Sequence, residues 1–377
     1  MQNSYPCNKL KLIAFLSIGI TIPFLFSLIV LELIFGNWFN SNSWIETQDL
    51  NIVRDSHLKF EIDTLYPGYG KVSTYSRDQY GLRQLCPIGA TIDILTIGGS
   101  TTDQRFISDE LTWQSHLQNE ISHYLNKNIC VSNAGVDGHS TFGHLASFRI
   151  WFPKIPILKP KLVLLYLGIN DAGFRFTPLV DFDLKNNLNH ETHIQALLRE
   201  RSALYRLLKQ LRDFLKSDPK PSFTEHKGGQ FRLDAYDAYR LTDGANGLAV
   251  DNALAFSKRL DQILTDINDM GSTPVCISQP NLHAIQKDGK LAGVHSAFIF
   301  DGVTYNGLDY DQSIKLLNKA MAQRCVSKGG FYIDMASHEF SFTDFYDLVH
   351  MNPTGTKKLS NFLFTELEKQ NVLQYLK

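Results

Sequence analysis

The sequence predicts an α/β protein, in which a three-layer α/β/α domain with a mostly parallel five-stranded sheet follows one transmembrane helix. Short apolar runs alternate with segments of helical spacing from residue 91 to residue 377. Each run is apolar along nearly its whole length, as is typical of strands buried on both faces of a parallel sheet. A stretch of twenty residues near the N-terminus carries no charge and is long enough to cross a bilayer.

The composition is that of a globular protein with one large domain or two ordinary ones. Hydrophobic residues make up 44% of the 377 residues and charged residues 20%, which excludes a disordered chain. The formal net charge is −1 and no block of like charge occurs. We therefore expect no nucleic-acid partner, and the overall charge balance gives no reason to expect attraction to an anionic surface.

The uncharged N-terminal stretch is residues 12–31. At a rise of about 1.5 Å per residue it spans about 30 Å, the hydrocarbon thickness of a bilayer. Lys9 and Lys11 precede it and the next basic residue is Arg54, which predicts a cytoplasmic tail at residues 1–11 and a domain outside the membrane. A cleaved signal peptide is the competing interpretation, but its apolar region is usually shorter and ends at an A-x-A-like site, which does not follow here.

The remaining elements follow in order along the chain. Residues 32–90 form an irregular lead-in, rich in Tyr and Gly, that we expect to pack on the domain formed by residues 91–377. The predicted strands are residues 92–98, 128–133, 161–168, 272–280 and 331–336. The predicted helices are residues 111–125, 141–152, 311–330 and 354–372. In such a sheet the carboxyl ends of the strands share one edge, where ligands bind.

Residues 172–255 interrupt this alternation. Within them, residues 193–215 are strongly helical and carry several Arg and Lys, and the segment that follows is polar and contains Gly. We expect a helical insertion and a long loop near the edge of the sheet that binds ligands. A lid over the site and a passive surface addition are equally compatible with the sequence.

The five cysteines show no metal-ligand spacing such as C-x-x-C, so no metal site is expected. The favoured interpretation of the cysteines is that they are small buried hydrophobic residues. Disulfides among the last four are the alternative if the domain lies in an oxidising compartment, and the sequence leaves the pairing open. Those four are Cys86, Cys130, Cys276 and Cys325.

Ser100 follows the first predicted strand directly, in "IGGSTT". A helix that starts there would offer free backbone N–H groups and a favourable dipole to a developing negative charge. Taken alone, Ser100 is more simply a helix N-cap. The G-x-S-x-G motif of α/β-hydrolases is absent, because Thr102 occupies the position of its second glycine.

Three further patches have polar or glycine residues that suit catalysis. "NAGVDGHS" follows the second strand and holds Gly135 and Gly138, which allow positive φ or close approach of a ligand. "LGIND" follows the third strand, and the amide of Asn170 can donate a hydrogen bond to an oxyanion. In "DLVH", Asp347 could orient the imidazole of His350. An ordinary turn explains either of the first two patches alone, and chance explains the Asp–His pair.

The combination of the patches carries more weight than any one of them. Three patches come directly after three successive strands, and the fourth follows the last strand. A parallel sheet gathers all four at one edge, where a nucleophile, two oxyanion donors and an Asp–His pair would meet. Those are the groups that acyl transfer requires. His139 and His144, near the same edge, are interpreted as surface or neighbouring residues.

In these blocks the chain resembles the SGNH/GDSL hydrolase superfamily over roughly residues 92–370. The resemblance implies a flavodoxin-like α/β/α fold with catalytic Ser100, Asp347 and His350. It implies an oxyanion hole formed by the Ser100 and Gly138 N–H groups and the Asn170 amide, with Gly135 the less favoured glycine by its spacing from Asn133. Block I departs from the common G-D-S, because Gly99 stands where the family often has Asp.

The resemblance implies a serine ester hydrolase that needs no cofactor or metal. Its substrate class would be acyl groups, such as acetyl, on a carbohydrate or another cell-envelope ester. An O-acyltransferase that modifies cell-surface polysaccharide would use the same residues, with a sugar hydroxyl in place of water. A non-catalytic, membrane-tethered binding protein on the same fold is the third alternative. The oligomeric state stays open.

Overall fold

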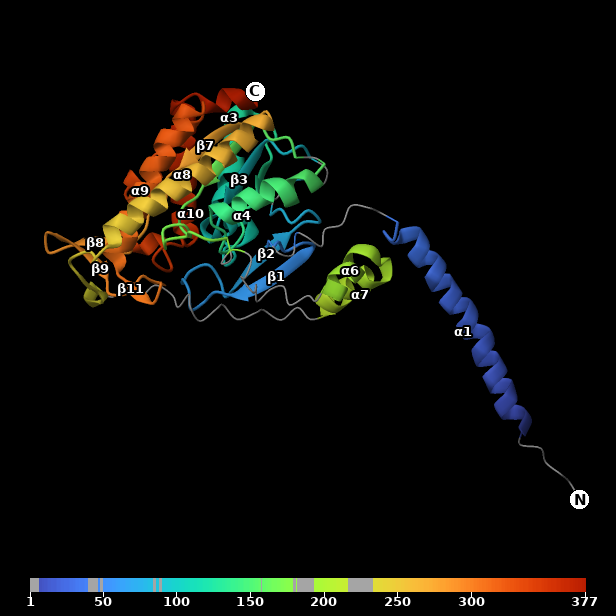
Figure 1. Ribbon diagram of the computed structural model, residues 1–377. Coiled ribbons are helices and arrows are strands. Elements are labelled where there is room, and N and C mark those ends of the chain that lie inside the picture. The colour runs from blue at the N-terminus through green and yellow to red at the C-terminus, as the bar shows by residue number, and fades with distance from the viewer. Residues whose placement is uncertain are drawn as a thin grey trace, which may run out of the picture. The chain divides into compact units, whose positions relative to one another are not determined.

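The computed structural model describes residues 7–39, 47, 50–83, 86–87, 90–156, 158–178, 181, 193–215 and 233–377 (Figure 1). The chain divides into two compact units. The first unit consists of Met1–Glu46 and His190–Ser217. The second consists of Thr47–Asn189 and Asp218–Lys377 and contains every predicted strand of the α/β domain.

A five-stranded, fully parallel sheet forms the centre of the second unit, as the sequence predicts. Its strands lie in the order β12-β7-β5-β3-β4. They span Ile94–Gly98 (β3), Val131–Asn133 (β4), Leu162–Tyr166 (β5), Thr273–Ile277 (β7) and Phe331–Ile333 (β12). β3 and β5 are buried at every position, because helices cover both faces of the sheet.

The helices form the two outer layers. Two of them, α3 and α10, pack together on one face, where their apolar residues join those of the sheet in a single core cluster. On the other face α8 and α9 run side by side (Figure 1). These helices span Trp113–Leu125 (α3), Ala245–Asp269 (α8), Gly307–Ser327 (α9) and Pro353–Lys369 (α10). The three-layer α/β/α prediction is therefore confirmed.

The strand order places a functional site at a defined position. β3 lies between β4 and β5, so the chain leaves β3 toward one side of the sheet and continues from β5 toward the other. In open parallel sheets of this order, ligands bind outside the carboxyl ends of the strands where the direction reverses. Gly98 ends β3 and Tyr166 ends β5, so the segments that follow them flank that point.

Several elements differ from the sequence prediction. The 25-residue α8 was not predicted, and its first residues fall inside the expected insertion. The expected helix at 141–152 is α-helical only to Ala146. It continues as a π-helical segment, Ser147–Trp151, and a 3₁₀ turn, Phe152–Lys154. Two small antiparallel sheets were also missed; one of their strands precedes α8, and the other four lie between β7 and α9. Their strands are β6 (Tyr236–Ala238), β8 (Ala284–Lys287), β9 (Lys290–Val294), β10 (Phe298–Phe300) and β11 (Val303–Tyr305).

The lead-in from residue 47 onward packs on the domain and is more regular than its composition suggested, whereas its first part, up to Glu46, belongs to the other unit. It contains an antiparallel hairpin of β1 (Ser56–Glu61) and β2 (Val72–Arg77). Apolar residues of this segment, including Phe60 and Tyr66, form a core cluster with Phe106 and Tyr346 of the domain. The hairpin thus belongs to the same folded unit as the sheet.

The first unit contains α1 (Cys7–Phe35), α6 (His193–Arg201) and α7 (Ala203–Leu215). The sequence predicted one continuous helix over 193–215, and the structure breaks it at Ser202. In the part of the chain that the structure describes, no helix combines the length and the apolar character needed to cross a membrane.

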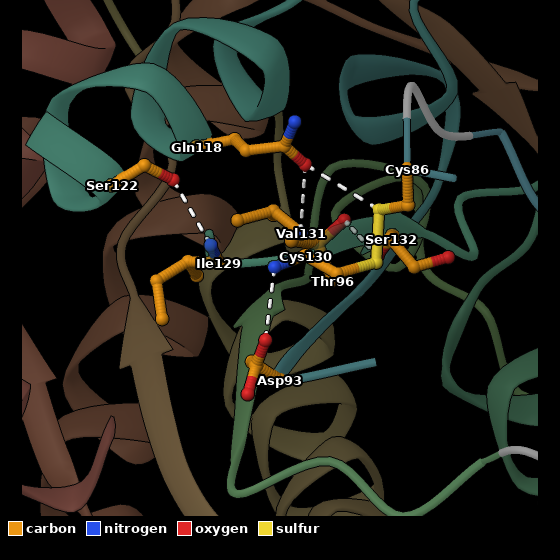
Figure 2. Close-up of a disulfide and its surroundings, with 9 residues drawn as sticks. All are labelled: Cys86, Asp93, Thr96, Gln118, Ser122, Ile129, Cys130, Val131 and Ser132. Carbon is orange, nitrogen blue, oxygen red and sulfur yellow. Dashed lines mark hydrogen bonds between the residues drawn. A yellow bond between two sulfur atoms is a disulfide. The ribbon is translucent and has the colours of Figure 1, made fainter. Parts of the chain in front are cut away.

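Four cysteines form two disulfides, so the favoured interpretation of unpaired buried cysteines is wrong for them. Cys86 pairs with Cys130 and Cys276 with Cys325. Figure 2 shows the first bridge beside the start of β4, where Gln118 accepts a hydrogen bond from the Val131 N–H at 3.0 Å. The disulfide and this side-chain bond restrain the outer strand β4, which also forms an isolated antiparallel bridge between Asn133 and Arg83.

Removing the Cys86–Cys130 bridge should lower stability. The bridge closes a loop with a sequence separation of 44 residues, and loops of this size are typically stabilised by about 2–4 kcal/mol. Replacing both cysteines by serine should lower the free energy of unfolding by that amount in urea titrations of the full chain. Cys7→Ser is the matched control and should leave the midpoint unchanged. An unchanged midpoint in the double variant would contradict the assigned role.

Candidate active site

Ser100 is the first residue of a short helix, α2 (Ser100–Asp103), that follows β3 after the single residue Gly99. Its Oγ lies 2.7 Å from Nε2 of His350, and Nδ1 of His350 lies 2.6 Å from Oδ2 of Asp347. With a proton on Nδ1 shared toward the carboxylate, Nε2 is free to accept the serine proton. The structure therefore brings together three residues that the sequence placed in two separate patches; their catalytic roles stay a prediction.

The loop from Asp347 to His350 allows a carboxylate to contact the imidazole of a residue only three positions later. Oδ1 of Asp347 accepts the backbone N–H groups of Val349 at 2.9 Å and His350 at 2.7 Å. The other oxygen, Oδ2, is left for the imidazole of His350. The Tyr346 N–H donates to the His350 carbonyl at 3.0 Å, which closes the loop. One carboxylate thus both shapes the turn and orients the ring.

The environment of His350 favours its charged form. Burial of the imidazole works to lower its pKa, but the charge of Asp347 and the hydrogen bond to it raise the pKa by more, so the net pKa lies above 6.5. The ring of Tyr346 stacks on the imidazole, with centroids 5.6 Å apart and planes 8° from parallel. An imidazole held in this way can take a proton from Ser100 and keep it beside a counter-charge.

Backbone and side-chain donors surround the position that an oxyanion would occupy. As the first residue of a helix, Ser100 has a backbone N–H with no intrahelical acceptor. Asn170 follows β5, and its Nδ2 donates to the His139 carbonyl at 2.9 Å, which fixes the amide. A Cβ built on Gly99 would lie 2.5 Å from that same Nδ2, so the Asn170 amide lies directly against the start of α2.

The same contact explains the departure at Gly99. A side chain at this position would collide with Asn170 Nδ2 at 2.5 Å and approach the His139 carbonyl at 3.1 Å. An aspartate in the common family position therefore does not fit here unless the Asn170 amide moves. Glycine at 99 is a requirement of this close packing.

The structure distinguishes the two glycines of the second patch. The N–H of Gly135 donates to Oδ1 of Asn133 at 2.7 Å and is therefore not available to a ligand. Gly138 lies in a turn with φ +78°, which favours glycine. Its N–H has no hydrogen-bond acceptor in the described segments. The Gly138 N–H, unlike that of Gly135, is thus available to a ligand, and its role as an oxyanion donor stays a prediction.

Buried carboxylates hold the second and third patches together. Asp171, next to Asn170, accepts the Thr141 N–H at 3.1 Å and the Thr141 hydroxyl at 2.6 Å, and Arg259 lies 3.2 Å from its Oδ1. Asp181 accepts the N–H groups of Ser140 and Gly143, both at 2.8 Å. These bonds fix the loop that carries Gly138 relative to the strand end that carries Asn170.

His139 and His144 are deeply buried, so the interpretation of them as surface residues is wrong. Both side chains are about as buried as the core, at 1% and 2% exposure. Burial lowers the pKa of His139 to about 4, and its Nε2 lies 2.8 Å from the Leu50 carbonyl. His139 contributes to the site through its backbone carbonyl, which orients Asn170.

The lead-in supplies residues that sequence reasoning missed. Arg77 at the end of β2 forms an ion pair with the buried carboxylate of Asp103, which also accepts the Tyr75 hydroxyl at 2.9 Å. Arg83 donates to the Asp103 and Gln104 carbonyls, both at 2.7 Å. The helix that carries Ser100 is therefore clamped by two arginines from outside the α/β domain. Nothing in the sequence distinguishes Arg77 and Arg83 from Arg54 and the other charged residues of the lead-in.

His283 and Tyr310 also belong to the neighbourhood of Asp347. Their rings stack with centroids 3.8 Å apart, and the Tyr310 hydroxyl donates to the Ile169 carbonyl at 2.7 Å. Burial lowers the pKa of His283 to about 3, although the charge of Asp347 acts in the opposite direction. Both rings are therefore neutral near pH 7.

A groove of about 520 Å³ opens beyond the ends of β7 and β12. Its lining includes Gln279 and Phe340 but neither Ser100 nor His350. Gln279 connects the two regions, because its Nε2 donates to the Thr101 hydroxyl at 3.1 Å and to the Tyr166 carbonyl at 2.8 Å. The chemistry-bearing residues lie beside this groove, at the ends of β3 and β5.

The sheet order and the meeting of the block residues at its switch point confirm the resemblance to SGNH-type hydrolases at the level of the fold. No family model and no curated protein matches the chain. Among solved structures, the chain is similar to a catalytic mutant of Axe2, an acetylxylan esterase from Geobacillus stearothermophilus. That pair is 12% identical over 75% of this chain and 96% of that chain, with a TM-score of 0.40.

Two further solved structures show similarities of the same size. TesA is 11% identical, over 74% of this chain and 98% of that chain, with a TM-score of 0.38. The psychrotrophic esterase EstA from Pseudoalteromonas sp. is 10% identical, over 74% of this chain and 97% of that chain, with a TM-score of 0.37. At TM-scores this low the similarities carry no argument about the activity or substrate of this chain.

Proposed function

We propose that this protein is a serine ester hydrolase. The observation that carries the proposal is the continuous hydrogen-bonded chain from Ser100 Oγ through His350 to Asp347, with distances of 2.7 and 2.6 Å. A nucleophile within reach of a base that is itself oriented by a third group is the arrangement of a covalent acyl-transfer site. The Asn170 amide and the start of α2 lie beside the nucleophile, where an oxyanion would form.

The steps follow from this geometry. His350 takes the hydroxyl proton as Ser100 attacks the ester carbonyl, and the oxyanion receives hydrogen bonds from the Ser100 N–H, the Gly138 N–H and the Asn170 amide. The C–O bond to the alcohol breaks, and His350 returns its proton to that leaving group. Water then attacks the acyl-serine as its proton passes to His350. The bond between Ser100 Oγ and the acyl carbon breaks, His350 returns that proton to Oγ, and the acid leaves. Asp347 stabilises the imidazolium in both halves.

A fluorophosphonate probe tests the nucleophile directly. The probe should label the full-length protein at one residue, and peptide mapping should place the adduct on Ser100. Absence of labelling in a folded protein would contradict the hydrolase and favour the non-catalytic binding protein. Labelling of a different serine would contradict the assignment of the site.

Replacing Asn170 with alanine should slow hydrolysis without loss of the fold. Removal of one oxyanion donor typically raises the barrier by about 2.7–4 kcal/mol, so kcat for a p-nitrophenyl ester should fall by about 10²–10³. Asn268→Ala, at the exposed end of α8, is the matched control and should retain activity. A fall of less than about threefold in Asn170→Ala would remove Asn170 from the oxyanion hole.

We propose acyl groups such as acetyl, on a carbohydrate or another cell-envelope ester, as the substrate class. The proposal depends on the resemblance in the four blocks and on a membrane-anchored domain. A screen of acetylated sugars and short p-nitrophenyl esters with the full-length protein tests it. Adding a polysaccharide acceptor to the same assay separates hydrolysis from O-acyl transfer, because transfer would move the acyl group to the acceptor instead of releasing the acid.

From the sequence pattern, and not from the described helices, none of which qualifies as a membrane span, we also propose that residues 12–31 anchor the protein as a single-pass segment, with residues 1–11 cytoplasmic and the α/β domain outside. The uncharged stretch and the Lys residues before it support this orientation. The two disulfides of the domain favour an oxidising, extracytoplasmic compartment. Retention of the full chain in the membrane pellet after alkaline extraction is expected, and release into the supernatant would contradict the anchor.

A further inference from the structure

One face of α7 is an exposed apolar stripe. Leu204, Leu207, Leu208 and Leu211 follow helical spacing, and their exposed fractions are 38%, 62%, 55% and 53%. Side chains three and four residues apart lie on one face of a helix, so the four leucines form one continuous surface. An apolar surface of this kind on a helix marks an interaction site. We call these four residues the leucine stripe.

Hydrogen bonds attach the leucine stripe to the C-terminal end of α1. The carboxylate of Glu32 accepts the backbone N–H groups of Ala203 at 3.1 Å and Leu204 at 2.9 Å, and so caps the start of α7. The Asn37 N–H donates to the Arg201 carbonyl at 2.8 Å, and the Arg201 guanidinium donates to the Asn37 carbonyl at 3.1 Å. The two segments belong to one compact unit although 160 residues separate them in sequence.

The hydrogen-bonded contact between the end of α1 and the start of α7 lies directly after the uncharged stretch, which bears on whether α7 meets a membrane. Glu32 is the first charged residue after residues 12–31, and the Trp38 indole donates to it at 2.8 Å. A tryptophan just beyond an apolar span is typical of the interfacial region of a membrane. If residues 12–31 lie in the bilayer, α7 begins at the level of the lipid headgroups.

The charge of the helical pair suits an anionic surface. Over residues 193–215 there are five Arg and Lys against two Glu and Asp, whereas the whole chain has a net charge of −1. The near-zero net charge of the whole chain therefore does not reflect the local excess of positive charge at residues 193–215. Arg206 and Lys209 lie away from the leucine stripe on the helix surface. An apolar stripe with basic residues on the other faces is the pattern of a helix that lies in the plane of a membrane interface.

We propose that α7 is an interfacial membrane helix, with the leucine stripe inserted at the boundary between headgroups and acyl chains and its basic residues toward anionic lipid headgroups. The proposal rests on the membrane anchor proposed above. It assigns the helical insertion to the membrane, in place of the lid and the passive surface addition that the sequence left open. The anchor and α7 would then form one membrane-bound unit.

Depth-dependent fluorescence quenching tests this proposal in the full-length chain. In a Cys7→Ser background the other four cysteines are in disulfides, so Leu208→Cys can be labelled selectively with a small fluorophore under non-reducing conditions. The protein is reconstituted in vesicles of phosphatidylcholine and phosphatidylglycerol, with or without lipid brominated in the upper acyl chain. Lys209→Cys is the matched control on another face of α7, and Ile20→Cys reports on the anchor.

Brominated lipid should quench the label at 208 at least about twofold more than the label at 209, because interfacial helices bury their apolar face about 5–10 Å into the bilayer. Equal quenching at 208 and 209 with strong quenching at 20 would overturn the proposal and leave the anchor intact. No quenching at 20 would instead contradict the anchor. A label at 208 that is shielded from both lipid and water would show that protein covers the leucine stripe, which also overturns the proposal.

Discussion

Ser100→Ala should abolish ester hydrolysis while leaving the fold intact. Loss of the nucleophile in a serine triad lowers kcat by about 10⁶, because the base and the oriented carboxylate have no second group to activate. Ser100 Oγ makes one hydrogen bond in the site, to His350 at 2.7 Å, and no core contact depends on it. The change should therefore show in kcat and not in the thermal unfolding curve.

The measurement compares p-nitrophenyl acetate turnover and fluorophosphonate labelling in wild type, Ser100→Ala and Ser327→Ala. Ser327 is exposed at the end of α9, where its Oγ donates to the Arg324 carbonyl at 2.8 Å, so its variant should behave as wild type. Residual activity of Ser100→Ala within about tenfold of wild type would mean that another group attacks the ester, and the assigned mechanism would be wrong.

Asp347→Asn should lower activity strongly and change its pH dependence. In serine triads, the equivalent change from Asp to Asn drops kcat by about 10⁴, because the imidazole is held in the wrong tautomer. Here the carboxylate also sets the loop, since its Oδ1 accepts two backbone N–H groups. Asn keeps an oxygen for those bonds, so the variant should fold.

The direction of the pH shift follows from the charges at His350. The imidazole must be neutral to accept the serine proton, so kcat/KM of wild type should rise with pH through a pKa above 6.5. In Asp347→Asn the burial that lowers this pKa remains, and the carboxylate that raises it is gone. The acid limb of the pH profile should therefore move to lower pH even as the maximum rate falls.

The free energy of unfolding gives an independent measure of the interaction between Asp347 and His350. Because the pKa of His350 is raised in the folded state, its stabilising effect is present at low pH and is lost as pH rises through the folded pKa. The difference in unfolding free energy between wild type and Asp347→Asn should be larger at pH values below the folded-state pKa of His350 than at pH values above it. Two results together would contradict the electrostatic coupling of His350 to Asp347. The acid limb of the kcat/KM profile would be the same in wild type and Asp347→Asn, and their difference in unfolding free energy would not change with pH.

Much of the central fold is readable from the sequence because buried parallel strands leave a strong pattern. β5 is apolar at every position, and each predicted strand of the sheet is found within a few residues of its expected bounds. The patches after these strands follow from the geometry of a parallel sheet, which explains why Ser100 and Asn170 could be placed near each other. His350 is harder to place, since its position depends on a loop beyond the last strand.

Elements whose stability depends on tertiary contacts were not readable in the same way. α8 begins in a segment that appears polar and contains Gly, and its buried face packs mainly on α9. The short β-strands before α9 have only three to five residues each and little alternation. Disulfide pairing depends on distances between segments, so Cys86–Cys130 and Cys276–Cys325 could be named only from the structure.

The contribution of the lead-in to the site was the part that the sequence predicted least. Its arginines act through contacts far along the chain: Arg77 and Asp103 are 26 residues apart, and the bond from Arg77 to the Gly135 carbonyl crosses 58 residues. No local periodicity records such pairings. Arg77 and Asp103 are both buried, so each needs the other as counter-ion.

That ion pair sets the boundary of the smallest chain that can be expected to work. A fragment cut at the start of the α/β repeat would delete Arg77 and Arg83 and leave buried Asp103, in the short helix that carries Ser100, with Arg105 at 3.9 Å as its remaining ion pair. Breaking a buried pair on one side typically costs about 3–5 kcal/mol. The hairpin is thus a structural part of the unit that holds Ser100, and any expressed fragment has to begin before residue 56.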